Sequence, residues 1–136
     1  MEKLVFIVDD EKDIRELISV NLKLYGFKTK EFSNGNSMLE YIKNTKPDLI
    51  LLDVMMPGID GINVCKILKN NEETLKIPVM LLTVKGQISD IENGFKAGAD
   101  FYVTKPFSSS TTKINLSINF LLGILIYYNI NNYKLK

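Results

Sequence analysis

Two strongly apolar runs that each end in carboxylates constrain this chain more than any other feature. Residues 4–8 read LVFIV and lead into Asp9 and Asp10, and residues 49–52 read LILL and lead into Asp53. Short apolar runs that alternate with helical segments are typical of buried parallel strands. Because adjacent parallel strands end at the same edge of a sheet, we expect Asp9, Asp10 and Asp53 to lie together there.

The rest of the chain continues the alternation of strand and helix patterns. An edge strand is expected over 27–32, a further buried strand over 78–82 and a weaker one over 100–103. Each of the first four strands is followed by a helical pattern. The sequence therefore predicts an α/β fold, a flavodoxin-like doubly wound sheet of five parallel strands in the order 2-1-3-4-5, with helices on both faces.

The helical patterns also predict which side chains point inward. The first helix begins at Asp10 or Glu11 and ends at Gly26, and the third runs from about Gly61 to Asn70. We expect the fourth to begin near Ile88. The side chains expected to face the core are Ile14, Leu17, Ile18, Leu22 and Tyr25 in the first helix, Met38, Leu39 and Ile42 in the second, and Ile91 and Phe95 in the fourth.

The expected strand ends carry complementary chemistry. The strand over 78–82 ends in Thr83, a hydroxyl donor, and Lys105, an anion partner, follows the last strand. Clustered carboxylates repel one another, and Mg2+ relieves that repulsion because it binds one or two carboxylates together with water and phosphate oxygens. Such a set favours phosphoryl transfer, which needs a nucleophile and extensive charge neutralisation.

These residues resemble the receiver domain of bacterial two-component response regulators. The resemblance extends from about residue 3 to residue 107 and rests on several motifs in the family's order and spacing. They are VDDE at 8–11, LDVMMPGIDG at 52–61, LT at 82–83, GAD at 98–100 and KPF at 105–107.

The resemblance implies a role for each site residue. Asp53 would be the phosphoacceptor, taking a phosphoryl group from a phosphohistidine on a sensor histidine kinase. Mg2+ would be held by Asp10, Asp53 and the main-chain carbonyl of Met55, with Asp9 contributing through water. The resemblance also implies that Lys105 neutralises the phosphoryl group.

A conformational switch is implied as well. Thr83 would move toward the phosphoryl group and Tyr102 would then swing inward, which shifts the population between two packings of the domain. The family also typically holds the bond between Lys105 and Pro106 in cis. One departure from the family lies at Val84, where a very small residue is usual, and its branched side chain is expected to narrow access to the acyl phosphate.

Each of these residues also has a purely structural interpretation. Asp9 and Asp10 could cap the first helix, and Thr83 could cap the fourth. Asp53 could be only a loop acid, although the apolar run before it disfavours that interpretation. Lys105 could be a solvated surface charge and Tyr102 half-buried packing. Two further residues are expected to be structural: Asp60, at a turn and helix start, and Cys65, as a small buried core residue.

Composition limits the remaining function classes. The 136 residues have a formal net charge of +1, so there is no global attraction to nucleic acid or membrane. The chain has no histidine and one cysteine, which excludes histidine-based catalysis and an intrachain disulfide. No signal peptide pattern follows Met1, so the expected location is cytoplasmic.

The C-terminal segment departs from the receiver pattern. We expect a receiver domain over 1–119 and an atypical apolar extension over 120–136, with no output domain and no direct nucleic-acid binding by this chain. No Asp or Glu occurs from residue 101 to 136. Three interpretations remain open: an altered fifth helix buried in a homodimer, a membrane-associating tail, which is disfavoured because the run is short, and a truncated or frame-shifted end.

Two other function classes remain as alternatives. An interaction module that is never phosphorylated would not need the acids or Lys105. A phosphatase with an aspartyl nucleophile would usually carry a second Asp two positions after the nucleophile in the first strand, where Asp9 is followed by Glu11. The sequence therefore favours an acceptor that at most phosphorylates and dephosphorylates itself, rather than an enzyme.

Overall fold

Five strands and four helices alternate along the part of the chain that the computed structural model describes, residues 3–83 and 88–104. In chain order they are β1 Leu4–Val8, α1 Lys12–Leu24, β2 Lys28–Phe32, α2 Gly35–Tyr41, β3 Leu49–Asp53, α3 Gly61–Lys69, β4 Val79–Thr83, α4 Ile88–Lys96 and β5 Phe101–Thr104.

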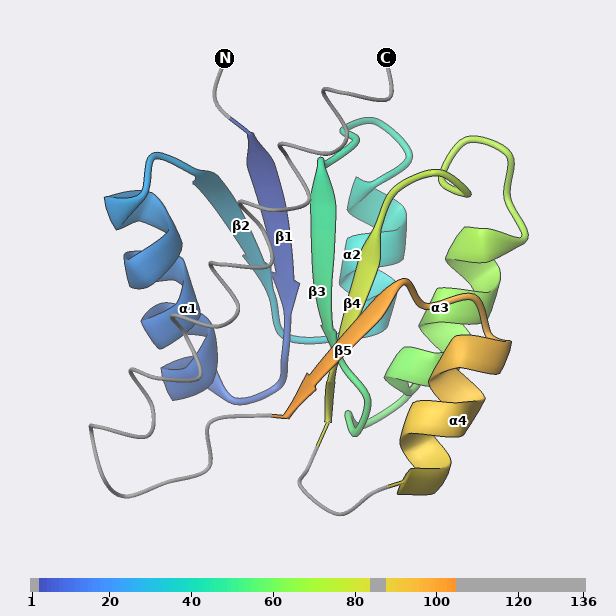
Figure 1. Ribbon diagram of the computed structural model, residues 1–136. Coiled ribbons are helices and arrows are strands. Elements are labelled where there is room, and N and C mark those ends of the chain that lie inside the picture. The colour runs from blue at the N-terminus through green and yellow to red at the C-terminus, as the bar shows by residue number, and fades with distance from the viewer. Residues whose placement is uncertain (1–2, 84–87, 105–136) are drawn as a thin grey trace.

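The strands form one parallel sheet in the order β2-β1-β3-β4-β5, which confirms the predicted fold. Val8 of β1 lies opposite Leu52 of β3, so the acids that follow these two residues leave the sheet side by side. All strands point the same way, and their carboxyl ends share the lower edge in Figure 1. The position where strand order reverses, between β1 and β3, is where open α/β sheets bind ligands.

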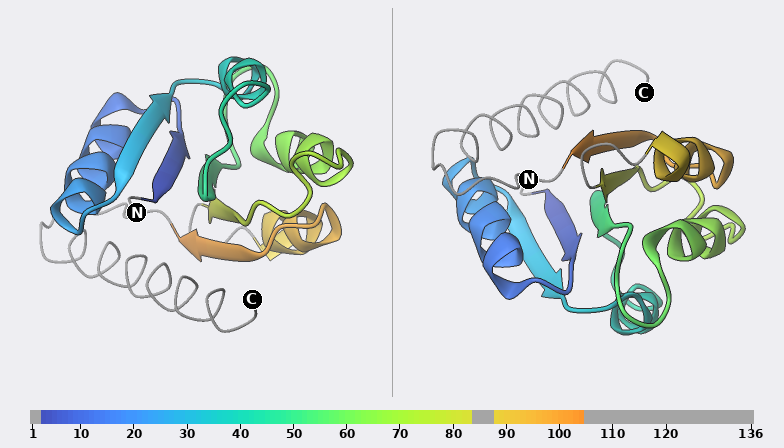
Figure 2. Two further views of the ribbon diagram at one scale, coloured as in Figure 1. Left: turned by 90° about the horizontal axis from the view of Figure 1, so that it is seen from above. Right: turned by 90° about the horizontal axis from the view of Figure 1, so that it is seen from below.

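The helices divide between the two faces of the sheet. Helix α1 lies on one face, and α2, α3 and α4 lie on the other (Figure 2). Successive side chains of each central strand point to opposite faces of the sheet, so alternate residues pack on the two sides. The α1 side of the core contains Val5, Ile7, Ile18, Leu22, Leu51, Met80 and Leu82, and the other side contains Phe6, Val8, Met38, Ile50, Leu52, Val64, Leu68 and Leu81.

Short polar residues begin two of the helices. The Asn34 carboxamide oxygen accepts the main-chain N–H of Ser37 at the start of α2, and an Asp60 carboxylate oxygen accepts that of Asn63 at the start of α3. These bonds satisfy amides that have no partner within the helix. The predicted structural role of Asp60 is therefore confirmed.

Two predicted core aromatic residues instead lie at the surface. Tyr25 is 56% exposed because α1 ends at Leu24 and Tyr25 caps the helix just before Gly26, whose φ of +90° turns the chain. Phe95 is 48% exposed and packs edge to face on Tyr102, with ring centroids 5.5 Å apart. Helix α4 instead turns Gly94 toward the sheet, where a Cβ would collide with Leu81.

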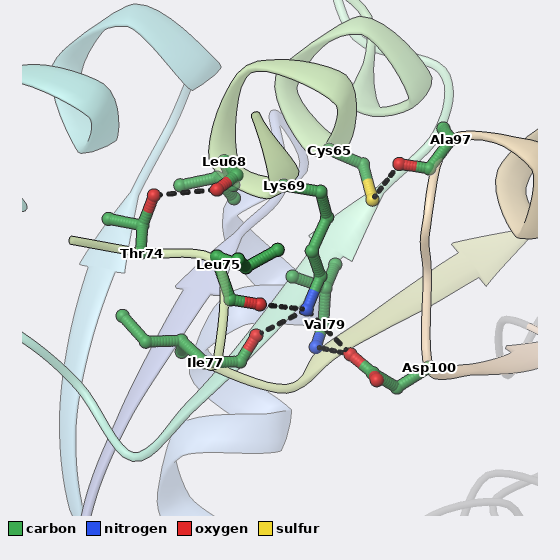
Figure 3. A network of polar contacts seen from close by, with 9 residues as sticks. All are labelled: Cys65, Leu68, Lys69, Thr74, Leu75, Ile77, Val79, Ala97 and Asp100. Carbon is green, nitrogen blue, oxygen red and sulfur yellow. Dashed lines mark hydrogen bonds and ion pairs between the residues drawn. The ribbon is translucent and has the colours of Figure 1, made fainter. Parts of the chain in front are cut away.

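A lysine joins α3 to the starts of β4 and β5 (Figure 3). The starts of these parallel strands lie at the opposite end of the sheet from the acids. The Lys69 ammonium donates to the carbonyl oxygens of Leu75 and Ile77 at 3.1 and 2.7 Å and to Asp100 Oδ2 at 2.9 Å. The same Asp100 oxygen accepts the Val79 amide. Because the Lys69 side chain is only 11% exposed, these contacts anchor the ends of three elements away from bulk water.

The predicted core position of Cys65 is confirmed. Its side chain is fully buried, and the thiol lies 3.7 Å from the Ala97 carbonyl oxygen. Burial raises the pKa of the Cys65 thiol to about 11, so the neutral form is favoured and the residue is a poor nucleophile.

The predictions for the C-terminal segment lie outside the described residues. They concern Lys105, the peptide bond before Pro106, the apolar run and the boundary at residue 119. Within the part of the chain that is described, none of the helices is both long and apolar enough to cross a membrane.

Candidate functional site

Three carboxylates meet at the carboxyl edge of the sheet, as the sequence predicts. Asp9, Asp10 and Asp53 each place a carboxylate oxygen within 4.8 Å of the others. Asp9 and Asp53 are buried at 0% and 2% exposure, whereas Asp10 is exposed. The cluster therefore has two acids embedded in the protein and a third that faces solvent.

The loop after β1 holds Asp9 in place. One Asp9 carboxylate oxygen accepts the Glu11 amide at 2.8 Å, and the Asp9 carbonyl oxygen accepts a bond from the Arg15 guanidinium at 2.7 Å. Arg15 also lies 3.5 Å from the Glu31 carboxylate at the end of β2. The N-cap position of α1 belongs to Glu11, without a side-chain bond, so neither acid of the pair occupies it.

The end of β3 orients Asp53. The Val54 amide extends the sheet by donating to the Leu82 carbonyl oxygen at 3.0 Å, and the Met55 amide donates to Asp53 Oδ1 at 3.3 Å. These contacts fix the backbone on both sides of the turn that follows Asp53. The Asp53 carboxylate is thereby directed into the acidic cluster.

Helix α3 approaches this turn closely through Gly61. The Gly61 amide donates to the Val54 carbonyl oxygen at 2.9 Å. A Cβ on Gly61 would lie 2.9 Å from both the carbonyl carbon of Asp53 and the Cα of Val54, and it would overlap the Asp53 carbonyl oxygen. Sequence reasoning took Gly61 only as a helix start, because close approach between distant main chains leaves no local signal in a sequence.

The donor set of the acidic cluster fits a hard divalent cation. All three ligand groups are carboxylates, which Mg2+ prefers, and histidine and cysteine are absent from the cluster. Two buried acids next to a third are costly in a medium of low dielectric unless a cation compensates them. The exposed position of Asp10 leaves one side of the cluster open for water and a phosphoryl group.

The other predicted site residues are placed only in part. Thr83 ends β4 and lies opposite Thr104 of β5, at the same edge of the sheet as the acids, but only its main chain is described. Met55 lies in the turn after Asp53, with its side chain 60% exposed. Tyr102 lies in β5 and is 41% exposed.

A shallow hollow lies beside the loop that follows Asp53, on the α4 side. It has a volume of about 450 Å3 and lies between the loop that follows Asp53 and the first turn of α4. Apolar side chains, including Met55 and Met56, line it together with Asp60 and Asp90. No sequence pattern pointed to this hollow, because its walls come from elements that are distant along the chain.

Comparison with known proteins agrees with this geometry. The family model of the response regulator receiver domain matches residues 5–116. A phosphate regulon transcriptional regulatory protein, PhoB of Pseudomonas aeruginosa, is 46% identical over 106 residues, which cover 78% of this chain and 46% of that protein. The chain thus spans about half the length of the curated relatives that it matches.

Solved structures show the same fold. The signal receiver domain of a signal transduction histidine kinase from Syntrophus aciditrophicus is 32% identical, with a TM-score of 0.73 over 89% of this chain and 90% of that one. The BeF3-activated receiver domain of DrrB is 31% identical, with a TM-score of 0.77 over 94% of this chain and 97% of that one. Taken with the acids at the ends of β1 and β3, these matches show that the chain belongs to the receiver domains of two-component response regulators.

Proposed function

We propose that Asp53 accepts a phosphoryl group from a phosphohistidine of a sensor histidine kinase. The observation that carries the proposal is the meeting of Asp9, Asp10 and Asp53 at the adjacent ends of β1 and β3. Of the three, Asp53 is the buried acid that ends the central strand, and the Met55 amide orients it. A fixed carboxylate at the switch point of the sheet is suited to in-line attack on phosphorus.

The transfer exchanges one bond to phosphorus for another. An Asp53 carboxylate oxygen forms the new P–O bond while the P–N bond of the phosphohistidine breaks, and the released imidazole nitrogen takes the bonding pair. The acyl phosphate places additional negative charge next to Asp9 and Asp10. Cationic compensation is therefore needed most after the transfer.

We propose that Mg2+ supplies part of this compensation. Asp10, Asp53 and the main-chain carbonyl of Met55 would hold the ion, and Asp9 would contribute through water. When bound, the ion would neutralise the acids and the phosphoryl oxygens. The carboxylate donor set supports this assignment. Lys105, which follows the residues of β5 in the sequence, would pair with the phosphoryl group.

The same proposal includes a switch through Thr83 and Tyr102. The position of Thr83 at the carboxyl end of β4 supports hydrogen bonding of its hydroxyl to the phosphoryl group. Tyr102 is half exposed and packs against Phe95 at the surface, so its ring has room to move inward. Phosphorylation would then shift the population between two arrangements of the surface formed by α4 and β5.

Receiver domains are signalling domains rather than enzymes with turnover, and they interact with sensor histidine kinases. We propose that this chain acts in the same way, in the cytoplasm. We also propose the domain limits 1–119 and 120–136 and a homodimer formed through the C-terminal segment. The absence of acidic residues after residue 100 and the apolar run at 120–128 support that interface.

Intact-mass measurement after treatment with acetyl phosphate and Mg2+ tests the phosphoacceptor. The wild-type chain should gain one phosphoryl group, and Asp53→Asn should gain none. Asp60→Asn is the matched control, because it removes a nearby acid outside the cluster and keeps an N-cap residue. Equal labelling of Asp53→Asn and wild type would refute the assignment, and continuous turnover of a phosphomonoester would indicate a phosphatase instead.

A further inference from the structure

Three segments of the described chain line the hollow. They are the loop from Val54 to Pro57, which leaves β3 at the lower edge of the sheet in Figure 1, the start of α3 at Asp60 and Ile62, and the first turn of α4 at Asp90. Most of the lining among the described residues is apolar, and the polar side chains in that part of the lining are the carboxylates of Asp60 and Asp90. None of the lysines or arginines among the described residues lines it.

The two carboxylates differ in their existing contacts. Asp60 accepts the main-chain amide of Asn63 at 2.9 Å and its side-chain amide at 3.0 Å. Asp90 is half buried and has no hydrogen bond or ion pair with the other described residues. Asp90 is therefore the carboxylate that can bind an incoming cation without giving up a contact inside the described fold.

The apolar wall selects among cations. Met55 is 60% exposed and Met56 only 8%, so two thioethers cover the hollow at different depths. Methionine side chains adapt their shape to an apolar ligand. A small hydrated ion gains nothing from such a surface, whereas an alkyl stem that ends in a cation can bury the stem against the methionines and place its charge at Asp90.

The position of the hollow indicates which protein would supply an alkyl side chain that ends in a cation. Val54 and Met55 line the hollow and directly follow Asp53, and the Met55 amide binds the Asp53 carboxylate. Any protein that delivers a phosphoryl group to Asp53 must therefore approach the rim of the hollow. We propose that the hollow receives an arginine or lysine side chain of the sensor kinase, with the aliphatic stem on Met55 and Met56 and the cation at Asp90. This inference rests on the proposed function.

A binding experiment tests the chemistry without a kinase. The full chain carrying 13C-methyl methionine is titrated with n-butylguanidinium chloride and followed by NMR. The methyl signals of Met55 and Met56 should shift saturably, whereas those of Met38 and Met80, which are buried elsewhere in the core, should stay unchanged. Butanol and guanidinium alone should bind more weakly, because each supplies only half of the proposed contact.

Charge variants separate a cation site from an apolar cleft. Asp90→Asn should weaken n-butylguanidinium binding about threefold to fivefold, the effect of losing one partly exposed ion pair. Glu92→Gln is the matched control, since it removes the same charge from an exposed residue of α4 that does not line the hollow, and it should bind as wild type does. Labelling of Asp53 by acetyl phosphate should be the same in both variants.

Three results would overturn the inference: unchanged Met55 and Met56 signals, equal binding of butanol, or equal affinity in wild type and Asp90→Asn. In the last case Asp60 and Asp90 would only stabilise the N-terminal turns of α3 and α4 through their negative charge. Failure of Asp53 labelling with intact n-butylguanidinium binding would instead refute the phosphoacceptor and, with it, the kinase as occupant, while the cation site would stand.

Discussion

Replacement of Gly61 by alanine should impair phosphoryl acceptance more than it impairs folding. The new Cβ would lie 2.9 Å from two main-chain carbons of the turn after β3, where about 3.5–4 Å is ordinary contact, and it would overlap the Asp53 carbonyl oxygen. The three nearest atoms all belong to the main chain, so side-chain rotation cannot relieve these collisions. Helix α3 and the turn would have to separate by about 1 Å.

The magnitude follows from two opposing contributions. Overpacking costs about 1–3 kcal/mol, and alanine in place of glycine at a helical position returns about 0.5–1 kcal/mol. The net loss of unfolding free energy should therefore lie between about 0 and 2.5 kcal/mol. A displacement of about 1 Å at a reacting group can lower its rate about 100-fold. We therefore expect acetyl phosphate to label Gly61→Ala about 10-fold to 100-fold more slowly than wild type, under conditions where both are folded.

Urea denaturation and the time course of intact mass measure the two effects separately. Gly94→Ala is the control, because its Cβ would meet the tip of the Leu81 side chain, a flexible core group rather than the main chain of the turn after β3. That variant should lose stability but keep its labelling rate. A wild-type labelling rate in folded Gly61→Ala would refute the idea that the close approach of α3 positions Asp53.

Four other changes have defined outcomes. Asp10→Ala should weaken Mg2+ binding, measured by calorimetry, and slow labelling, and full metal affinity would contradict its role as a ligand. Lys69→Met should lower the unfolding free energy, measured in urea, by about 2 kcal/mol, because two carbonyl oxygens lose their donor. The lost ion pair with Asp100 adds little to this value, because Asp100 is 38% exposed and solvent screens the pair. Labelling at the opposite end of the sheet should persist. Burial raises the pKa of Cys65 from 9.0 to about 11, so the stability that the neutral thiol contributes is complete below pH 9 and is lost as the pH rises toward 11. Between these pH values the unfolding free energy of wild type should fall by about 2–3 kcal/mol more than that of Cys65→Ala. Parallel curves of unfolding free energy against pH would contradict this. Sedimentation should show that the full chain self-associates and that a version ending at Asn119 does so less; two monomers at tens of micromolar would count against the proposed dimer.

Local patterns in the sequence predict most of the architecture. The apolar runs at 4–8 and 49–52 predict β1 and β3 because strands buried on both faces need continuous apolar residues. The order of strands and helices then leaves few permitted topologies, and the observed sheet follows the predicted one. The meeting of Asp9, Asp10 and Asp53 was predictable for the same reason, since parallel neighbours end at one edge.

Only the tertiary structure decided which of the individual side chains are buried and which way they point. It buries Asp9 and Asp53 but exposes Asp10, and it turns Phe95 outward because Gly94 occupies the contact with the sheet. It also brings Gly61 onto the main chain of Asp53. Periodicity along one segment reports which face of that segment is apolar, whereas the rotation and distance of a packed helix depend on the volumes of residues that are remote in the sequence.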